Sequence, residues 1–456
     1  MRAGETPGDH RGSAEHGADA ESRLRWSEAD AERRLRSLEL FGMRFGLDRM
    51  RRLMTALDSP ERRFRSIQVL GTNGKTSTTL MIAAILERHG LRTGSYTSPH
   101  LVSYRERIRI GEREIDSESF AGAVARASHA AERVNRTLAE DDHVTQFELL
   151  TAAALWEMAE REVEVAVIEA GLGGRYDATS VIAPDVTVLT NVGLEHTRWL
   201  GPTLTHIAEE KLAVLPARGT LALGTDLAPA ALAVAERLAS ARGARIVRPD
   251  RAATDKLGSV GAFQRRNFAL AVVAVRAWLQ QRGVAFDEGA VRGAAAATSV
   301  PGRLQLLEGD PPTILDGAHN PDAVAALLEA LPEVRRPGPL ALVLGVLEDK
   351  DAAAMLAVLL PVCDHAWFTA PPSSRALYPA ALQSLARQQG FESVTLDPRP
   401  ASALAAARAW AAEHGGTVLA TGSVYLVGDL LRVATLEPGA GGARSGSVPL
   451  RQRGSP

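Results

Sequence analysis

Short apolar runs alternate with Ala- and Leu-rich stretches along most of the chain. The runs include SIQVL, which precedes residue 71, VEVAVIEA at 163–170 and DVTVLTNV at 185–192, and TILDGA, ALVLGVL and TVLATG follow further on. β-prone runs separated by helical patterns are typical of parallel sheets that are covered by helices. The pattern therefore predicts an α/β protein.

A domain boundary is predicted where a long alanine-rich helical pattern ends in Pro-Gly (TSVPGR, 298–303) and a second strand-helix series begins. A chain of 456 residues also exceeds what one hydrophobic core usually organises. We therefore expect a domain at 31–300 and a smaller one at 301–436. Residues 1–30 and 437–456 are rich in Gly, Ser, Pro and charge, which predicts disorder.

Composition excludes several classes of function. The net charge of -2 provides no basic field for nucleic acid, and no apolar run approaches the length of a membrane span. The polar N-terminal residues lack the apolar region of a secretory signal. Cys363 is the single cysteine, so there can be no internal disulfide and no thiolate metal cluster. We expect a cytoplasmic protein that needs neither membrane nor nucleic acid, and a monomer.

Lysine is rare in this chain. It occurs at Lys75, Lys211, Lys256 and Lys350, while every other basic position, histidine aside, is arginine. A lysine that survives such a bias can mark chemistry that a guanidinium cannot perform, such as a compact phosphate contact or a deprotonated amine.

The stretch GTNGKTS (71–77) has the residues of a phosphate loop in an unusual spacing. The standard form G-x-x-x-x-G-K-[ST] would need Gly where this chain has Val69. A strand, a glycine turn and a helix N-terminus would nevertheless aim N–H groups at a phosphate. Lys75 would reach the β- and γ-phosphates, and Thr76 or Ser77 would offer a hydroxyl to Mg²⁺. The alternative is a glycine turn with a chance lysine.

Acidic and imidazole side chains follow two later strand patterns. Glu169 ends one apolar run, where a carboxylate could bind Mg²⁺, and His196 follows the next run on a loop. The intervening GLGG lacks the spacing of a dinucleotide fingerprint because Tyr176 stands at the third glycine position. Each side chain also has a purely structural interpretation. Lys211, for example, could simply pair with a neighbouring glutamate.

The C-terminal part has one similar group of residues. LDGAHNPDA places Asp316, His319 and Asn320 just after a strand, at the edge where α/β sheets bind ligands. Single polar residues there often serve as turns or caps, but the combination favours a site.

These motifs occur in a specific order: GTNGKTS, YTSPHLVSYRERI, TQFE, EAGLGGRYDATS, LEHTRWLG, EEKLAVL, PGR and LDGAHNPDA. Together they resemble the folylpolyglutamate synthase/dihydrofolate synthase family of the Mur ligase superfamily, from about residue 34 to about 435. The compressed glycine spacing is typical of that superfamily. The resemblance implies an N-terminal Mur-ligase-type P-loop ATPase domain with a mostly parallel central sheet, and a smaller Rossmann-like α/β C-terminal domain.

The resemblance also implies roles for the residues that match the motifs. The expected ATP-binding residues are Asn73, Gly74, Lys75, Thr76, Ser77, Asn267, Arg303 and Asp316. One or two Mg²⁺ ions would be held by Ser98, Glu169, His196 and the hydroxyl of Thr76 or Ser77. The pterin substrate would contact Thr145, Gln146, Phe147, Glu148, Tyr176, Asp177 and Ala178, and the incoming glutamate would lie near His319, Ser423 and Tyr425. Lys75, Lys211 and His319 are the expected catalytic residues, with Lys211 carbamylated.

Two features depart from the family pattern. Many members have Gly after the loop lysine, where this chain has Thr76. The stretch 222–263 looks shorter than usual and lacks a clear strand pair before the segment that contains Asn267.

The implied reaction is ATP-driven addition of L-glutamate to dihydropteroate, to folate or to both, through an acyl phosphate. TQFE and RYDAT favour a bifunctional enzyme. A Mur-type peptidoglycan precursor ligase is the alternative substrate class, and a non-catalytic nucleotide-binding relative is the alternative outside enzymes. A switch GTPase is disfavoured, because none of the lysines follows an asparagine as the guanine motif N-K-x-D requires.

Overall fold

The computed structural model describes residues 26–38, 46–250, 256–307 and 309–436. The chain divides into two compact units, Met1–Arg63 with Ile115–Arg161, and Phe64–Glu114 with Glu162–Pro456. Most of the two end segments predicted to be disordered lies outside the described residues. The prediction for 1–30 extends too far, however, because a helix already begins at Glu28.

The first unit is helical. Its elements are α2 (Glu28–Arg36), α3 (Asp48–Ala56), η2 (Pro60–Arg62), α5 (Ser117–Asn135) and α6 (Gln146–Glu160). Capping boxes at Ser27 and Thr145 start α2 and α6, so that orphan N–H groups of both helices are satisfied. Helix α5 packs against α2, α3 and α6, and its alanines permit close approach.

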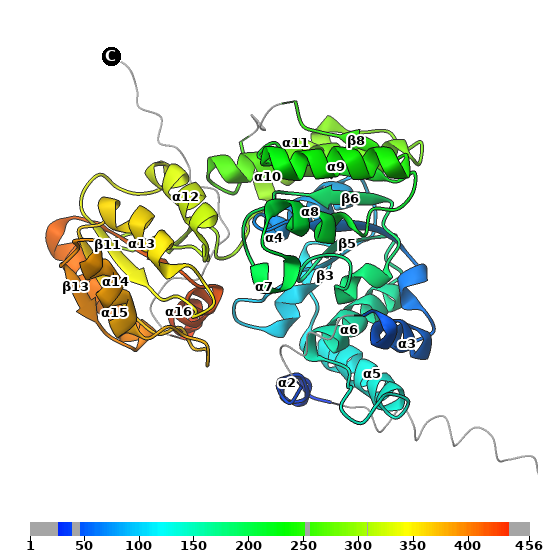
Figure 1. Ribbon diagram of the computed structural model, residues 1–456, viewed down its shortest axis with the longest axis horizontal. Helices are drawn as coiled ribbons and strands as arrows, with labels where there is room; N and C mark the ends of the chain where they lie inside the picture. The colour runs from blue at the N-terminus through cyan, green and yellow to red at the C-terminus, as the bar shows by residue number, and fades with distance from the viewer. Residues whose placement is uncertain (1–25, 39–45, 251–255, 308, 437–456) are drawn as a thin grey trace, which may run out of the picture. The chain divides into compact units, whose positions relative to one another are not determined.

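The second unit contains two sheets (Figure 1). The strands of the first are β1 (Arg65–Leu70), β2 (Thr93–Tyr96), β3 (Ile108–Ile110), β4 (Arg113–Glu114), β5 (Val165–Glu169), β6 (Val186–Leu189), β7 (Thr220–Leu223) and β8 (Arg245–Val247). They lie in the order β4-β3-β2-β5-β1-β6-β7-β8. All pairings are parallel except those of β2 with β3 and of β3 with β4.

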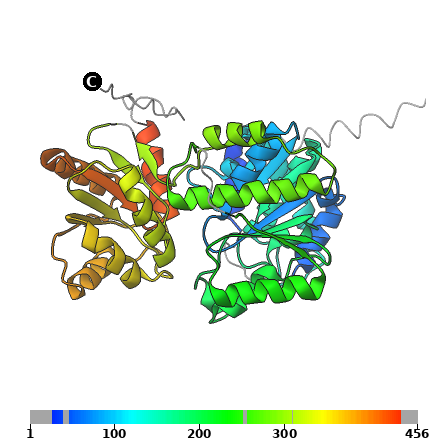
Figure 2. The same cartoon turned by 90° about the horizontal axis from the view of Figure 1, so that it is seen from above.

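Two layers of helices cover the half of this sheet around β1, β6 and β7. One layer contains α4 (Lys75–Arg88), α10 (Ala262–Gln280) and α11 (Glu288–Ala297), and the other contains α8 (Leu204–Leu212) and α9 (Pro229–Arg242). Figure 2 shows α10 in light green and α9 in darker green on opposite sides of the strands. The remaining elements are η3 (Tyr104–Arg107), η4 (Ala178–Val181) and α7 (Thr197–Leu200). Burial on both faces explains the near-continuous apolar runs of the central strands.

The segment at 222–263 contains more regular structure than the sequence suggests. Strands β7 and β8 form there, with α9 between them, so the expectation that a strand pair is missing was wrong. The sequence signal is weak because β8 has three residues, with its first exposed and the others half-buried. Such a short edge strand carries little hydrophobic periodicity.

The second sheet has strands β9 (Gln305–Leu307), β10 (Thr313–Leu315), β11 (Leu340–Leu344), β12 (His365–Phe368), β13 (Val394–Leu396) and β14 (Thr417–Thr421). Their order is β13-β12-β11-β14-β10-β9, parallel except for β9. Its helices are α12 (Pro321–Ala330), η5 (Leu331–Glu333), α13 (Ala352–Leu359), η6 (Leu360–Val362), α14 (Pro379–Gln388), α15 (Pro400–His414) and α16 (Val424–Leu436). Helices α12, α13 and α14 pack on one face, and α15 and α16 pack on the other. The chain passes from the first sheet to the second between α11 and β9, the segment that contains TSVPGR.

Within the described parts of the chain, none of the helices has both the length and the apolar character that crossing a bilayer requires.

A buried ion pair in the first unit generates a stability prediction. Arg49 donates to Glu148 over 3.1 Å, and each side chain is 8% exposed. Removing one partner leaves the other charge buried, so Arg49→Met should lower the free energy of unfolding by about 3 kcal/mol. Urea unfolding measures this loss.

The matched control is Arg63→Met, because Arg63 pairs with Glu160 over 3.2 Å while both side chains are 47% exposed. That pair should contribute less than about 1 kcal/mol. Equal losses in the two variants would contradict the assignment of Arg49 to a buried pair.

Candidate active site

The predicted phosphate loop joins β1 to α4, with α4 starting at Lys75. Gly71 and Gly74 have φ of 149° and 81°, and both also face crowded surroundings. A Cβ atom at Gly71 would lie 1.8 Å from Thr190 Oγ1, and one at Gly74 would lie 2.6 Å from Asn267 Oδ1. Only glycine combines this backbone conformation with so close an approach. The unusual glycine spacing is therefore a well-defined turn.

Residues after β6 hold the loop in place. Asn191 Oδ1 accepts hydrogen bonds from the N–H groups of Thr72 and Asn73 at 3.2 and 2.8 Å, and Thr190 Oγ1 donates to the Asn73 carbonyl at 2.6 Å. The first intrahelical bond of α4 runs from Thr78 N to the Gly74 carbonyl. The N–H groups just before Thr78 thus lie at the positive end of the helix, where an anion is favoured.

Two lysines converge on one carbonyl oxygen of the loop. Lys75 Nζ and Lys211 Nζ donate to the Gly71 carbonyl at 3.2 and 2.8 Å. The Lys211 residue is 5% exposed. Burial and then the neighbouring Lys75 charge lower the pKa of Lys211 to about 7, against an attractive contribution from Glu195. At neutral pH a substantial fraction of Lys211 is therefore the neutral amine.

Glu169 lies at the end of β5, against the start of α4. Its carboxylate accepts from Thr76 Oγ1 at 2.9 and 3.0 Å and from the Ser98 N–H at 3.0 Å. Burial raises the pKa of Glu169 to about 6, although Lys75 and these hydrogen bonds oppose the rise. Ionising this buried carboxylate costs free energy, and a cation at this position would offset that cost by stabilising the ionised form.

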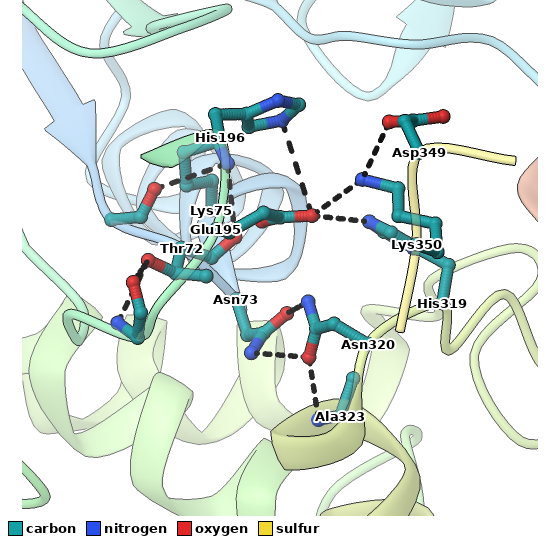
Figure 3. Close-up of polar contacts among 12 residues, drawn as sticks. Thr72, Asn73, Lys75, Glu195, His196, His319, Asn320, Ala323, Asp349 and Lys350 are labelled. Carbon is teal, nitrogen blue, oxygen red and sulfur yellow. Dashed lines mark hydrogen bonds and ion pairs between the residues drawn. The ribbon is translucent and has the colours of Figure 1, made fainter. Parts of the chain in front are cut away.

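A second acidic group, Glu195, lies on the loop after β6 (Figure 3). Its Oε1 is 2.8 Å from Lys350 Nζ, 3.5 Å from His319 Nε2 and 3.9 Å from His196 Nε2. Burial raises the pKa of Glu195, but His319 and then Lys350 outweigh it and hold the pKa far below its usual range. Burial lowers the pKa of His196 to about 4, so its imidazole is neutral and able to bind a metal.

Loops of the second sheet complete the polar surroundings. Asp316 is 3% exposed and accepts from the N–H groups of Leu304 and Ala318 at 2.8 and 2.7 Å. Burial raises the pKa of Asp316, and the nearby Arg303 opposes the rise. Asn320 caps α12 and exchanges amide hydrogen bonds with Asn73 of the phosphate loop at 2.9 and 3.2 Å (Figure 3).

One cavity of about 1040 Å³ brings most of the predicted site together. Its lining includes the predicted residues Asn73, Gly74, Lys75, Thr76, Ser77, Ser98, Glu169, His196, Asn267, Arg303, Asp316 and His319. Lys211 is not among the lining residues, and its buried amine donates to the Gly71 carbonyl. Residues from loops of both sheets therefore face a single space.

Apart from His319, the predicted substrate contacts are not part of this lining. Asp177 is buried and caps η4, and Tyr176 beside it is 47% exposed. Ser423 is 1% exposed and accepts from the Tyr425 N–H at 3.2 Å. Ala178 is buried as well. The substrate-binding role of these residues stays a prediction.

The residues of TQFE belong to the first unit. There Thr145 caps α6, Gln146 donates to the Leu35 carbonyl at 2.8 Å, and Glu148 pairs with Arg49. Phe147 lies in the first turn of α6 beside them. Each of the polar side chains has a structural partner within the unit, and their substrate role remains a prediction.

Sequence reasoning assigned no role to Glu195, Asn191 or Lys350. Two of them lie in the stretch NVGLEH beside His196, and Lys350 is one of the four lysines. The sequence thus offered two signals, the position of Asn191 and Glu195 near His196 and the rarity of lysine. Neither signal identifies the side chain that each residue contacts.

Across the described ranges, no group of three or more His, Cys, Asp and Glu side chains is placed to hold a metal ion. The predicted metal ligands in the cavity are one carboxylate, Glu169, the hydroxyls of Thr76, Ser77 and Ser98, and the imidazole of His196. Such a sparse oxygen-rich set fits Mg²⁺, which keeps several waters and binds through one or two carboxylates plus substrate phosphates.

Comparison with known proteins finds two domain families in the chain. The Mur ligase middle domain matches residues 69–218, and the Mur ligase glutamate ligase domain matches residues 302–424. The folylpolyglutamate synthase of Lacticaseibacillus casei is 36% identical over 358 residues, covering 73% of this chain and 83% of that protein. The dihydrofolate synthase/folylpolyglutamate synthase of Bacillus subtilis is 31% identical over 416 residues, covering 86% and 95%.

Solved structures are similar over almost the whole chain. Mycobacterium tuberculosis folylpolyglutamate synthase complexed with ADP has a TM-score of 0.82 and 31% identity, covering 89% of this chain and 98% of that one. Escherichia coli FolC in complex with DHPP and ADP has a TM-score of 0.78 and 28% identity, covering 90% and 98%. The predicted α/β fold with mostly parallel sheets is therefore confirmed.

The lowered pKa of Lys211 predicts a pH-dependent stability. Between about pH 7 and the ordinary value of 10.5, the amine is neutral in the folded state but charged in the unfolded chain. The unfolded state then binds more protons, so a rise in pH stabilises the folded state. Wild type should gain up to about 1.4 kcal/mol per pH unit relative to Lys211→Met.

Urea unfolding at about pH 7.5 and about pH 9.5, in buffer free of carbon dioxide, measures this difference. The same pH dependence in both proteins would show that Lys211 titrates normally.

Proposed function

The chain belongs to the folylpolyglutamate synthase/dihydrofolate synthase family, and we propose that it is an ATP-dependent ligase that adds L-glutamate to a pteroate or folate acceptor. The acceptor is dihydropteroate, the γ-carboxylate of a folate, or both. The supporting observation is the single cavity that the phosphate loop shares with Arg303, Asp316 and His319 of the second sheet. A nucleotide bound there would meet groups from both sheets.

The reaction proceeds in two steps. An acceptor carboxylate oxygen attacks the γ-phosphoryl group of ATP, which forms an acyl phosphate and releases ADP. The amine of L-glutamate then attacks the acyl carbon, the bond to phosphate breaks, and the amine loses a proton as the amide forms. Lys75 and the N-terminal N–H groups of α4 stabilise the negative charge that spreads over the phosphate oxygens.

The metal would be held by Glu169, Ser98 and His196 with the hydroxyl of Thr76 or Ser77. Mg²⁺ bound there supplies positive charge to the transferring phosphoryl group. Thr76 orients the Glu169 carboxylate through its hydroxyl, and the Ser98 N–H fixes one carboxylate oxygen. His196 presents a neutral imidazole, because partial burial lowers its pKa to about 4 although 35% of the side chain is exposed.

Carbamylation of Lys211 is part of the proposal. The reaction with carbon dioxide requires a neutral amine, and the lowered pKa of Lys211 supplies one near neutral pH. The modification would also replace a cation with an anion beside Lys75, at the Gly71 carbonyl that both amines contact. Charge repulsion would thus become attraction, a change that an arginine at this position could not undergo.

The test of function uses ATP, Mg²⁺ and L-glutamate with dihydropteroate or tetrahydrofolate as acceptor, and detects glutamylated product by mass spectrometry. We expect product with at least one of the two, and product with both would establish a bifunctional enzyme. Product formed only with a peptidoglycan precursor would replace the folate assignment with the alternative ligase class. Nucleotide binding without any product would favour a non-catalytic protein.

Replacement of Lys211 should separate its catalytic role from its structural one. Lys211→Ala should lower kcat by about 100-fold or more, because an anionic group that orients the charged site is lost. Circular dichroism should show a folded protein. The carbamate carbon should appear in ¹³C NMR of wild type incubated with ¹³C-bicarbonate and be absent from the variant.

Lys256→Ala is the matched control, because Lys256 is exposed and lies outside the cavity lining. It should retain wild-type turnover. Unimpaired turnover of Lys211→Ala, or an unchanged ¹³C signal, would contradict the carbamate proposal.

A further inference from the structure

Three of the four lysines of the chain come together around one site. Lys75 and Lys211 share the Gly71 carbonyl, and Lys350 lies on the loop between β11 and α13. The fourth, Lys256, is exposed. The function proposed above uses Lys75 and Lys211 but gives no role to Lys350.

Lys350 is partly buried, in an ion pair that joins loops of the two sheets. Its Nζ is 2.8 Å from Glu195 Oε1, and the side chains are 10% and 12% exposed. Asp349 is a weaker partner, 3.6 Å away and 38% exposed. His319, also from the second sheet, approaches the same Glu195 oxygen at 3.5 Å. The Lys350 ammonium and the His319 imidazole of one sheet therefore approach a single carboxylate of the other, Glu195 (Figure 3).

The place of Glu195 links this pair to the reacting groups. Glu195 immediately precedes His196, and both line the cavity with His319. The hydrogen bonds between Asn73 and Asn320 join loops of the two sheets at a second point, from the phosphate loop to the start of α12. Each charge of this largely shielded pair is destabilised when it loses its partner, so the ion pair favours the arrangement in which the loop after β6 and the loop after β11 are together.

We propose that Lys350 is a positioning residue for the ligation. Its ion pair with Glu195 keeps His196 and His319 facing the same cavity and thereby excludes water from that cavity. This proposal rests on the proposed function. The acyl phosphate is the species at risk: water that attacks the acyl carbon releases phosphate and returns the acceptor carboxylate unchanged. ATP is then consumed without amide formation. Lys350 would thus determine how much of the ATP used yields product.

The test compares Lys350→Met, Lys350→Arg, Glu195→Gln and the double variant Lys350→Met/Glu195→Gln with wild type. Methionine keeps the unbranched side chain and removes the charge, whereas arginine keeps the charge. We measure kcat, the KM for ATP and the ratio of ADP to glutamylated product. Wild type should form one ADP for each amide.

Lys350→Met should lower kcat about tenfold or more and raise the ratio of ADP to product, while the KM for ATP changes less than about threefold. Lys350 contacts Glu195 and Asp349, which lie outside the phosphate loop, so ATP binding should be preserved. Lys350→Arg should recover most of the coupling. The double variant should be no worse than Lys350→Met, because both substitutions remove the same interaction.

Lys256→Met is the control and should match wild type. Normal kcat and one ADP per amide in Lys350→Met would overturn the proposal, as would additive losses in the double variant. A loss of kcat with unchanged coupling and no rescue by arginine would also overturn it, since that result indicates a merely structural role. Failure of the wild-type enzyme to form any glutamylated product would instead overturn the proposed function.

Discussion

The parallel pairing of β1 between β5 and β6 is the constraint on which the site depends. Its register sets Val69 beside Glu169 and Leu70 beside Leu189, so the three strands end at the same edge of the sheet. The phosphate loop, the acidic end of β5 and the loop after β6 must therefore meet there. The buried apolar side chains on both faces fix that register, since slipping by one residue would reverse every side chain.

A second property of the site is that several like charges lie close together at that edge of the sheet. Two lysines share the Gly71 carbonyl, and two carboxylates, the buried Glu169 and the partly buried Glu195, line the same cavity. His319 and Lys350 hold the pKa of Glu195 low, whereas burial raises the pKa of Glu169. The same chemical group is thus set to two different states by its neighbours. Glu169 needs a cation to ionise fully, and Glu195 already has one.

Much of the fold and part of the site could be predicted from particular residues. The phosphate loop was recognised from its glycines and Lys75, and the apolar run before Glu169 placed that carboxylate at a strand end. Strand β8 was missed because three residues with an exposed start have too little pattern. Asp177 and Thr145 show why a functional role is hard to assign to a motif residue from sequence. Both side chains cap the start of a helix, so their presence in the motif also has a structural explanation.

The sequence by itself determined the α/β class, the turn at Gly71 and the polar residues that follow the central strands, because each is encoded within a few neighbouring residues. Only the tertiary structure decided which of them meet. Glu195 pairs with Lys350 across 155 positions, and Asn73 pairs with Asn320 across 247. Such partners depend on which strand ends of the two sheets come together. That depends on packing across both sheets, which local periodicity does not specify.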